Sequence, residues 1–346
     1  MDIRTLEWKN NKVRTIDQTK LPHKFKYLDI DNIKDMWRAI KELKVRGAPA
    51  LGAAAALGVY LGIRDSKAGG FDEFSRELDK ASKYMASSRP TARNLFWGIE
   101  RSCSIAVSNR DKTVAEIKRL ILKEALNLIE EDRVNCRKIG EAGAQLIKPG
   151  QTVLTICNAG ILATIDYGTA LGVIYRAQEE GKAPKVFACE TRPLLQGARL
   201  SAWELLMKKV EATLICDNTA AALMKEGRID LVITGADRIA ANGDSANKIG
   251  TLGLAIACSY HKVPFYVAAP ASTFDSSIDS GKQIKIEERE AKEITGFFLK
   301  DLQVFRGVDV FNPAFDVTPH ELISAIITDK GIIRPPYKEN IRKILC

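Results

Sequence analysis

Residues 231–248, LVITGADRIAANGDSANK, place chemically capable side chains directly after an apolar run. The β-branched residues of this run predict a buried strand, and Asp237, Asn247 and Lys248 lie in the polar stretch that follows it. In open α/β sheets, ligands bind beyond the carboxyl ends of the strands. Asp237 is therefore a candidate for proton transfer, and its alternative role is to cap the loop or to pair with Arg238.

Cys157 ends another predicted strand, TVLTIC, and precedes residues 158–160, where a helix is expected to begin. The positive end of a helix lowers the pKa of a nearby thiol from about 8.5, which would activate Cys157. A cysteine at a strand end can equally be a small buried apolar residue. Cys189 and Cys216 occupy similar positions. If Cys157 and Asp237 face one crevice, the thiol and the carboxyl group are suited to proton transfer at adjacent atoms.

Three further segments offer donors for a phosphate or a sugar. Asn247 and Lys248 precede a predicted helix start, and a helix N-terminus beside a lysine suits a phosphate. Residues 46–49, RGAP, offer backbone N–H groups and a guanidinium, or simply form a turn before a helix. Arg89 also precedes a predicted helix, where it would bind an anion or an acidic side chain. Gln196 begins another predicted helix and would bind sugar hydroxyls or brace its loop.

The sequence lacks the motifs of the commonest cofactor sites. No GxxxxGK[ST] pattern is present for nucleotide phosphates, and no GxGxxG pattern follows a predicted strand for a dinucleotide. The three histidines lie far apart, and no CxxC or HxxxH pair offers zinc ligands. We therefore expect neither a metal nor another cofactor.

Composition indicates a soluble globular protein. The chain of 346 residues is long enough for two domains, with 46% hydrophobic and 27% charged residues. The net charge of +9 comes from lysines and arginines dispersed among acidic residues, so nucleic acid is not an expected partner. The seven cysteines lack the paired spacing of disulfide-rich secreted domains, which predicts a cytoplasmic location.

No signal peptide is predicted, because Met1 is not followed by a basic segment and then an apolar one. Gly47–Ile63 is uncharged, but it is shorter than the roughly 20 residues that span a bilayer, and it is rich in alanine and glycine. We expect a buried, tightly packed helix there and no membrane partner.

The first half of the chain is predicted to be mostly helical. LEWKNNKVRTID predicts a hairpin with an Asn-Asn turn. The predicted helices run from an Asp31 cap to about Leu43, from about Ala50, over 72–85, from Thr91, and from Thr113 to about Ile147.

After Pro149 the pattern changes to short apolar runs that alternate with amphipathic segments. The strands are expected in TVLTIC, VFACE, ATLICD, LVITGAD and PFYVAAP, and the helices over 161–180, 196–209, 219–226 and 248–261. This alternation predicts a Rossmann-like, doubly wound parallel sheet. The expected α/β architecture is a helical N-terminal domain with a small β-sheet, residues 1–125, and a Rossmann-like domain, residues 126–346, entered through a long helix.

Six segments together resemble the methylthioribose-1-phosphate isomerases of methionine salvage, relatives of the regulatory subunits of translation initiation factor 2B. They are RGAPALG (46–52), SRPTARNL (88–95), TICNAGILAT (155–164), ETRPLLQGARLSAWEL (190–205), DNTAAALM (217–224) and ITGADRIAANGDSANKIGTLGLA (233–255). They cover most of the chain in the order of the family. The combination of RGAPA, CNAG and GADRIAANGD with NK is more specific to the isomerases than to the wider family.

The resemblance implies roles for individual residues. The catalytic cysteine of the CNAG motif corresponds to Cys157, and the catalytic aspartate of GAD corresponds to Asp237. The residues implied to contact the substrate are Arg46, Gly47, Ala48, Arg89, Gln196, Asn247 and Lys248. A homodimer formed through the second domain is implied as well.

The expected reaction is the aldose-to-ketose isomerisation of 5-methylthioribose 1-phosphate to 5-methylthioribulose 1-phosphate, without a cofactor. Two alternatives remain among enzymes: isomerisation of ribose 1,5-bisphosphate or of 5-deoxyribose 1-phosphate. A non-catalytic regulatory subunit like those of initiation factor 2B is the alternative from another class. Such a subunit has no need for Cys157, Asp237, Arg46 and Arg89 together.

Overall fold

A computed structural model describes residues 3–296 and 308–345. The chain divides into two compact units. Unit 1 comprises Met1–Arg137 and Ala159–Gly168, and unit 2 comprises Lys138–Asn158 and Thr169–Cys346. The chain therefore leaves unit 2 directly after Asn158 and returns to it at Thr169. The predicted fold class is confirmed: a mostly helical unit with a small sheet is followed by a unit built on a mostly parallel sheet.

The N-terminal sheet of unit 1 is antiparallel, in the order β1 (Leu6–Lys9), β2 (Lys12–Ile16), β3 (Tyr27–Ile30). Asn10 and Asn11 join β1 to β2, and both have positive φ, 52° and 58°. Two-residue hairpin turns favour this conformation because its twist matches that of the strands, and asparagine tolerates it well. The predicted hairpin is thus confirmed.

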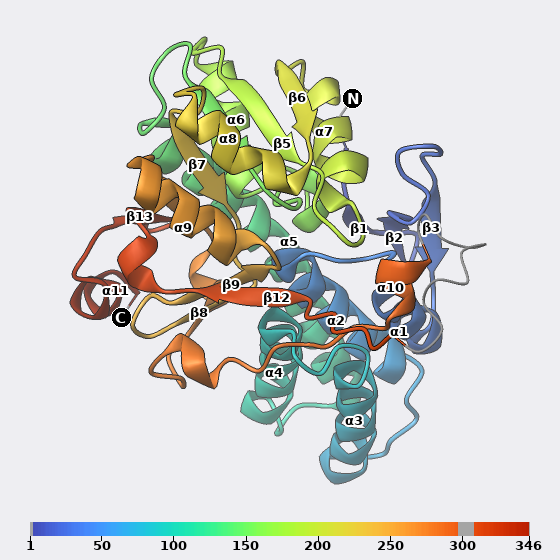
Figure 1. Cartoon of the computed structure of the whole chain (residues 1–346). Coiled ribbons are helices and arrows are strands. Elements are labelled where there is room, and N and C mark those ends of the chain that lie inside the picture. The colour runs from blue at the N-terminus through green and yellow to red at the C-terminus, as the bar shows by residue number, and fades with distance from the viewer. Residues whose placement is uncertain (1–2, 297–307, 346) are drawn as a thin grey trace. The chain divides into compact units, whose positions relative to one another are not determined.

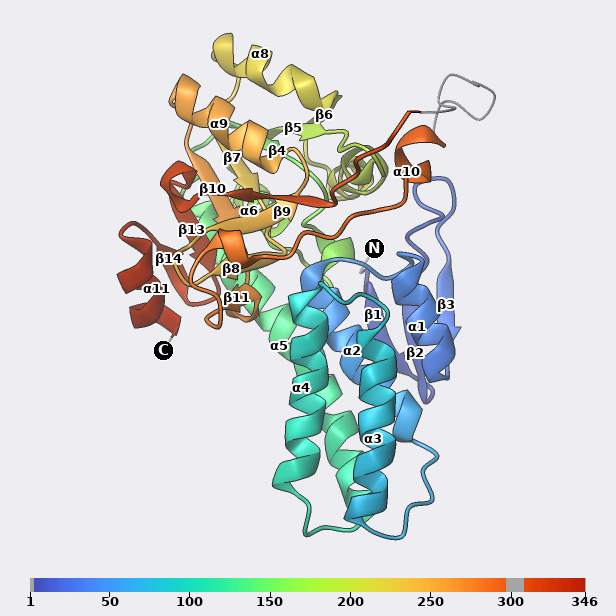
Figure 2. The same cartoon turned by 60° about the horizontal axis from the view of Figure 1, so that its bottom comes forward.

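Five helices follow: α1 (Ile33–Lys41), α2 (Ala48–Ile63), α3 (Phe71–Ala86), α4 (Arg93–Ser108) and α5 (Val114–Ala144). Figure 2 shows α3 and α4 lying side by side. α2 is buried along nearly its whole length, as predicted for its run of alanine and glycine. Among the residues described, no helix is long and apolar enough to cross a membrane. The predicted domain boundary at 125/126 lies inside α5.

The helix starts depend on local caps. Asn32, not the predicted Asp31, caps α1, because the Asn32 side chain accepts a hydrogen bond from the Asp35 amide at 2.9 Å. α5 starts as predicted after Thr113, which forms a capping box with Glu116. α4 begins at Arg93, two residues after the predicted Thr91.

The large sheet of unit 2 has the order β14-β13-β10-β7-β4-β5-β6 and is parallel apart from β14 (Figure 2). Its strands are β4 (Thr152–Thr155), β5 (Lys185–Cys189), β6 (Ala212–Ile215), β7 (Leu231–Thr234), β10 (Phe265–Ala268), β13 (Ala325–Thr328) and β14 (Gly331–Ile333). Counted along the chain, the six parallel strands have the order 3-2-1-4-5-6, which is that of Rossmann folds. The order reverses between β4 and β7, so the topological switch point lies there.

The helices of unit 2 are α6 (Ala170–Glu179), α7 (Ala202–Met207), α8 (Ala220–Lys225), α9 (Thr251–His261), α10 (Lys292–Thr295) and α11 (Tyr337–Leu345). α8 and α9 lie side by side (Figure 1). A second sheet has the order β11-β8-β9-β12, from β8 (Arg238–Ala240), β9 (Ser245–Lys248), β11 (Phe274–Asp275) and β12 (Phe315–Thr318). The sequence analysis missed these four strands, because they are short and are defined by partners far along the chain.

Two predicted helices were wrong in extent. The helix expected over 248–261 begins at Thr251, since 245–248 pairs with β8 and β12 as strand β9. The helix expected over 161–180 is a single 3₁₀ turn, Ile161–Ala163, followed by bends over 164–167 and then by α6.

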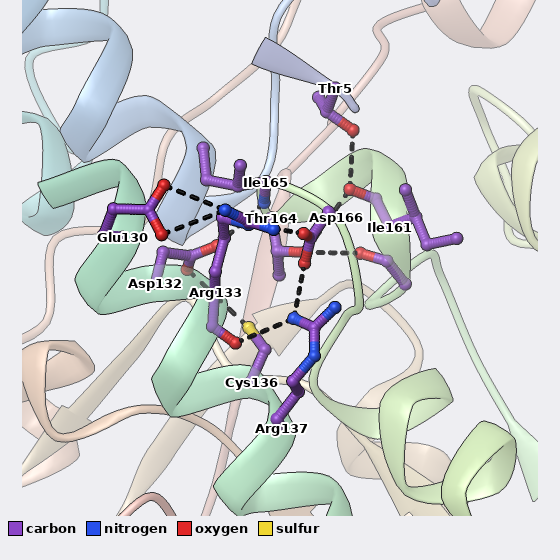
Figure 3. Close-up of polar contacts among 11 residues, drawn as sticks. Thr5, Glu130, Asp132, Arg133, Cys136, Arg137, Ile161, Thr164, Ile165 and Asp166 are labelled. Atoms are coloured by element: carbon purple, nitrogen blue, oxygen red, sulfur yellow. Dashed lines mark hydrogen bonds and ion pairs between the residues drawn. The ribbon is translucent and has the colours of Figure 1, made fainter. Parts of the chain in front are cut away.

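Polar contacts within unit 1 hold the segment Ala159–Gly168 (Figure 3). The Asp132 carboxylate of α5 accepts from the Ile165 amide at 2.8 Å. Asp166 forms ion pairs with Arg133 and Arg137, at 2.6 and 2.9 Å. Because these partners come from α5, local helical periodicity did not decide the conformation of this segment.

Candidate active site

Cys157 and Asp237 flank the topological switch point of the large sheet. Cys157 follows β4 and Asp237 follows β7, and these two strands are parallel neighbours in the sheet. Both residues therefore emerge at the same carboxyl edge, where ligands of open α/β sheets bind. The structure places the two predicted catalytic residues after neighbouring strands, at the same edge of the large sheet.

The backbone of Cys157 is held in the left-handed region, with φ 66°. This region costs a residue with a Cβ atom about 1–2 kcal/mol. Both of its peptide groups are hydrogen-bonded to side-chain hydroxyls. The Cys157 amide donates to Thr191 Oγ1 at 2.8 Å, and Ser201 Oγ donates to the Cys157 carbonyl at 2.7 Å.

The loop that contains Thr191 is itself held by a residue that follows a third strand of the sheet, β6. Thr191 is fully buried and also left-handed, with φ 69°. The carboxylate of Asp217, which follows β6, accepts from the Thr191 and Arg192 amides, both at 2.7 Å. Charge-assisted bonds of this kind are stronger than neutral ones. At the carboxyl edge, hydrogen bonds thus connect the loop after β6 to the loop after β5, and the loop after β5 to the loop after β4.

A buried polar network continues from Asn158. Its side-chain amide donates to Glu204 Oε1 at 2.8 Å and to Ser201 Oγ at 3.2 Å. The Tyr175 hydroxyl donates to the other Glu204 oxygen at 2.9 Å. A buried carboxylate is costly unless it is bonded in this way, so these contacts fix the side chain of Asn158 beside Glu204 of α7 and link it to Tyr175 of α6.

Asp237 is partly buried, and its amide donates to the Ala246 carbonyl at 2.8 Å. This bond places β9 and Asn247 next to the predicted acid. Arg238 does not require Asp237 as its ion-pair partner, because its guanidinium pairs with Asp275, with Nε at 2.9 Å from the carboxylate.

Asn247 and Lys248 are both buried, at the end of β9. Lys248 Nζ donates to the Ala314 carbonyl at 2.8 Å and lies 4.8 Å from the centre of the Phe315 ring. Asn247 Nδ2 donates to Thr251 Oγ1 at 3.0 Å. A buried lysine and a buried amide close to Asp237 suit a polar, anionic ligand.

The expectation that α9 offers its N-terminus to a phosphate was wrong. The carboxylate of Asp316 accepts from the Gly250 and Leu252 amides, at 2.7 and 3.0 Å. It therefore occupies the site that an anion would need.

Gln196 lies just before a π-helical turn, Gly197–Ser201, after β5. Its side chain is buried, and Oε1 has no hydrogen-bond partner among the residues described. Leaving a buried polar atom unsatisfied is costly, and such atoms often receive a ligand. Gly197 permits the close approach of this turn to β5, because a Cβ atom there would lie 1.7 Å from the Cys189 carbonyl oxygen.

The other predicted contacts belong to unit 1. Arg46 is buried, and its Nε donates to Gln18 Oε1 at 2.9 Å. Gln18 Nε2 in turn donates to the Leu162 carbonyl at 2.7 Å. Gly47 has φ 94°, and a Cβ atom there would lie 2.3 Å from the Cα of Ala163. Only glycine fits between Arg46 and the first residue of α2, which is Ala48.

Arg89 lies in the loop between α3 and α4, where the Ala92 amide donates to its carbonyl at 3.1 Å. α2 and α4 cross near their first turns, since a Cβ atom on Gly98 would meet the Gly52 carbonyl at 2.1 Å. Arg46 and Arg89, which precede these helices, therefore lie toward the same end of the helix pair.

The two rival cysteines have environments that disfavour thiolates. Burial raises the pKa of Cys189 to about 12. The charge of Glu190 raises the pKa of the exposed Cys216. Thiolates are the reactive form, so both are poor nucleophiles near neutral pH.

The sequence analysis did not identify Thr191, Ser201 or Asp217. Asp217 follows a predicted strand, as Cys157 and Asp237 do, and this position was the available signal. Among the residues described, Asp244, His320 and Glu321 lie close enough to hold a cation. The Asp244 carboxylate, however, already accepts from the Gly281 and His320 amides, which is a bracing role.

Comparison with known proteins shows that the chain is similar to isomerases and to initiation-factor subunits. The model of the initiation factor 2 subunit family matches residues 44–335. The methylthioribose-1-phosphate isomerase of Acetivibrio thermocellus is 54% identical, over 99% of this chain and 99% of that protein. The 5-deoxyribose 1-phosphate isomerase of Moorella thermoacetica is also 54% identical, over 99% and 98%.

Solved structures also match nearly the whole chain, among them the following two. The 5-methylthioribose 1-phosphate isomerase of Pyrococcus horikoshii has a TM-score of 0.88 and 44% identity, with 99% of this chain and 95% of that chain covered. A structure described as translation initiation factor eIF-2B subunit delta, from A. fulgidus, has a TM-score of 0.85 and 47% identity, with 99% of each chain covered.

Proposed function

We propose, from the premise that the chain belongs to the initiation factor 2 subunit family, that it is a methylthioribose-1-phosphate isomerase. The reaction is the conversion of 5-methylthioribose 1-phosphate to 5-methylthioribulose 1-phosphate. The observation that carries the proposal is the placement of Cys157 and Asp237 on either side of the switch point, in a chain about half identical to such isomerases over its full length.

The chemistry must begin with ring opening, because the phosphate on the anomeric oxygen prevents simple opening of a hemiacetal. Asp237, as general acid, protonates the ring oxygen as its bond to C1 breaks. Hydrogen then moves from C2 to C1 with the assistance of Cys157, and the C2 hydroxyl becomes the ketone as it gives its proton to the Asp237 carboxylate, which restores the acid. A carboxyl group that donates a proton near neutral pH needs a raised pKa, which an apolar, closed site would supply.

The substrate contacts that we propose follow from charge and burial. Gln196, with its unsatisfied buried oxygen, accepts from a sugar hydroxyl. Asn247 and Lys248 bind polar groups of the substrate beside Asp237. In unit 1, Arg46 and Arg89 supply guanidinium groups, and the backbone of Gly47 and Ala48 supplies N–H donors for anionic oxygens.

The decisive experiment incubates the purified protein with 5-methylthioribose 1-phosphate, after chelator treatment and without nucleotide, and follows the sugar by NMR. The ketose should appear in the wild type. Asp237→Asn should block its formation, because an amide cannot deliver the ring-opening proton. The hydrogen of C2 can move to C1 as a hydride or as a proton, and substrate labelled with deuterium at C2 distinguishes these two routes. Hydride transfer retains the label at C1, whereas proton transfer allows exchange with water.

A second candidate substrate is 5-deoxyribose 1-phosphate, since a relative of that activity is 54% identical over nearly the full length. The two sugars differ only in the methylthio group at C5. The ratio of their kcat/KM values therefore measures how much an apolar pocket for this group contributes to the preference for 5-methylthioribose 1-phosphate. Ribose 1,5-bisphosphate, used in the same assay, tests the remaining alternative among enzymes, which is isomerisation of that sugar. Absence of turnover with all three sugars would leave the regulatory subunit as the remaining function.

We further propose that the enzyme is a cytoplasmic homodimer of methionine salvage. The cysteine usage supports the location, and the resemblance to the isomerases supports the dimer and the pathway. Light scattering coupled to size-exclusion chromatography tests the dimer directly, because the monomer mass is 38.2 kDa.

A further inference from the structure

Side chains from two neighbouring loops hold both peptide groups of Cys157. We propose that Thr191 and Ser201 are positioning residues that hold the Cys157 thiol in its reactive placement, and that Asp217 keeps Thr191 in position. This inference rests on the proposed catalytic role of Cys157.

The first argument is the conformation of Cys157. A φ of 66° is disfavoured for cysteine, and such conformations persist only where the surroundings determine them. Here Thr191 Oγ1 accepts from the Cys157 amide at 2.8 Å, and Ser201 Oγ donates to its carbonyl at 2.7 Å. The two bonds fix the peptide planes on either side of Cα and therefore the direction of the Cα–Cβ bond that carries the thiol.

The second argument is that the hydroxyls are fixed in turn. Thr191 Oγ1 also donates to the Cys189 carbonyl at 3.0 Å, which orients its lone pairs toward Cys157. Asp217 holds the backbone of Thr191 through two bonds of 2.7 Å to successive amides. Ser201 receives a bond from Asn158 at 3.2 Å.

The third argument is a contrast within the same unit. Thr328 is buried like Thr191 and makes the same kinds of bond: its hydroxyl donates to the Gly331 carbonyl and accepts from the Lys330 amide. Those partners lie within three residues, so Thr328 stabilises only its own turn. Thr191 instead reaches Cys157, 34 residues away along the chain. Thr328 therefore serves as the matched control for a role in placing the thiol.

The test compares Thr191→Val, Thr191→Ser, Ser201→Ala and Asp217→Ala with Thr328→Val. Thr191→Val keeps the shape and β-branching of threonine but removes the hydroxyl. We expect kcat to fall at least about 10-fold while KM changes less than about 3-fold, because the thiol acts on the transition state more than on substrate binding. Thr191→Ser, which restores the hydroxyl, should recover kcat to within about 2-fold of the wild type.

A second measurement does not depend on activity: the rate at which iodoacetamide alkylates Cys157, followed by mass spectrometry of its peptide. In Thr191→Val the partly buried thiol leaves its fixed placement and should react at least about 3-fold faster, because accessibility limits alkylation. The exposed Cys216 provides an internal reference in the same sample. Thr328→Val should change neither kcat nor the rate at Cys157.

A kcat or a Cys157 alkylation rate in folded Thr191→Val that equals the wild-type value would overturn the proposal. If circular dichroism shows that Thr191→Val does not fold, Ser201→Ala carries the same expectations. If the wild type turns over none of the three sugars, the proposed function fails, whereas the alkylation rates still decide whether these hydroxyls place the thiol.

Discussion

Asp132 should make the stability of this protein fall as the pH rises toward neutrality. Its side chain lies on α5, where it accepts from the Ile165 amide and approaches the Cys136 thiol at 3.7 Å (Figure 3). Burial raises the pKa of Asp132 from 3.8 to about 7, and the charge of Asp166 adds to the effect. The folded protein therefore holds a proton at Asp132 over a pH range in which the unfolded chain has released it.

The sign and size follow from this difference in pKa. Between about pH 4 and pH 7 the unfolded chain binds fewer protons at this site, so the free energy of unfolding falls as the pH rises. Each unit of pKa difference corresponds to about 1.4 kcal/mol. The shift of Asp132 from 3.8 to about 7 therefore removes about 4 kcal/mol in total, of which about 3 kcal/mol is lost between pH 5 and pH 8.

Asp132→Asn isolates this contribution, because asparagine stays neutral and its carbonyl can still accept from the Ile165 amide. Urea unfolding of both proteins at pH 5, 6, 7 and 8 gives the difference in free energy of unfolding. Tryptophan fluorescence suits the measurement, since Trp8, Trp37 and Trp97 lie in the same unit as Asp132.

We expect the free energy of unfolding of Asp132→Asn to rise by about 3 kcal/mol relative to that of the wild type as the pH rises from 5 to 8. Asp65→Asn is the control, because that side chain is 83% exposed. The difference in free energy of unfolding between this variant and the wild type should stay nearly constant over the same pH range. A difference for Asp132→Asn that changes by less than about 0.5 kcal/mol over the same range would refute the reasoning. Asp132 would then be ionised in the folded protein.

Three further predictions concern the proposed reaction. Cys157→Ala should abolish turnover of 5-methylthioribose 1-phosphate while far-UV circular dichroism stays unchanged, whereas Cys189→Ala should be mild; the reverse pattern in kcat would show that the wrong thiol was chosen. Arg46→Ala and Arg89→Ala should each raise KM by about 10- to 150-fold, because a charge-assisted contact contributes about 1.5–3 kcal/mol, and unchanged KM values in both would remove them from the substrate site. Asp237→Asn should retain substrate affinity in calorimetry but lose kcat, and loss of affinity with normal kcat would contradict its role as the acid.

The sequence alone determined the features that depend on neighbours along the chain. The hairpin at Asn10-Asn11, the helix expected over 72–85 and observed as α3, and the start of α5 after Thr113 follow from turn chemistry, periodicity and capping. The alternation of apolar runs and amphipathic segments predicted the parallel sheet. The same alternation put Cys157 and Asp237 after strands, because a strand's end is visible where its apolar run stops.

Tertiary contacts decided the rest, because their partners lie far apart in the sequence. Lys248 lies in a strand, not at a helix start, since β9 pairs with β12 across a separation of nearly 70 residues. Asp316 caps α9 across a separation of 66 residues and closes the N-terminus that was expected to bind phosphate.

The left-handed conformation of Cys157 belongs to the same class of features. It depends on hydroxyls 34 and 44 residues away. Periodicity reports only which face of an element is apolar, whereas these bonds form when separate loops meet at one edge of a sheet. The sequence therefore indicated which residues could react, and the fold determined how the thiol is held.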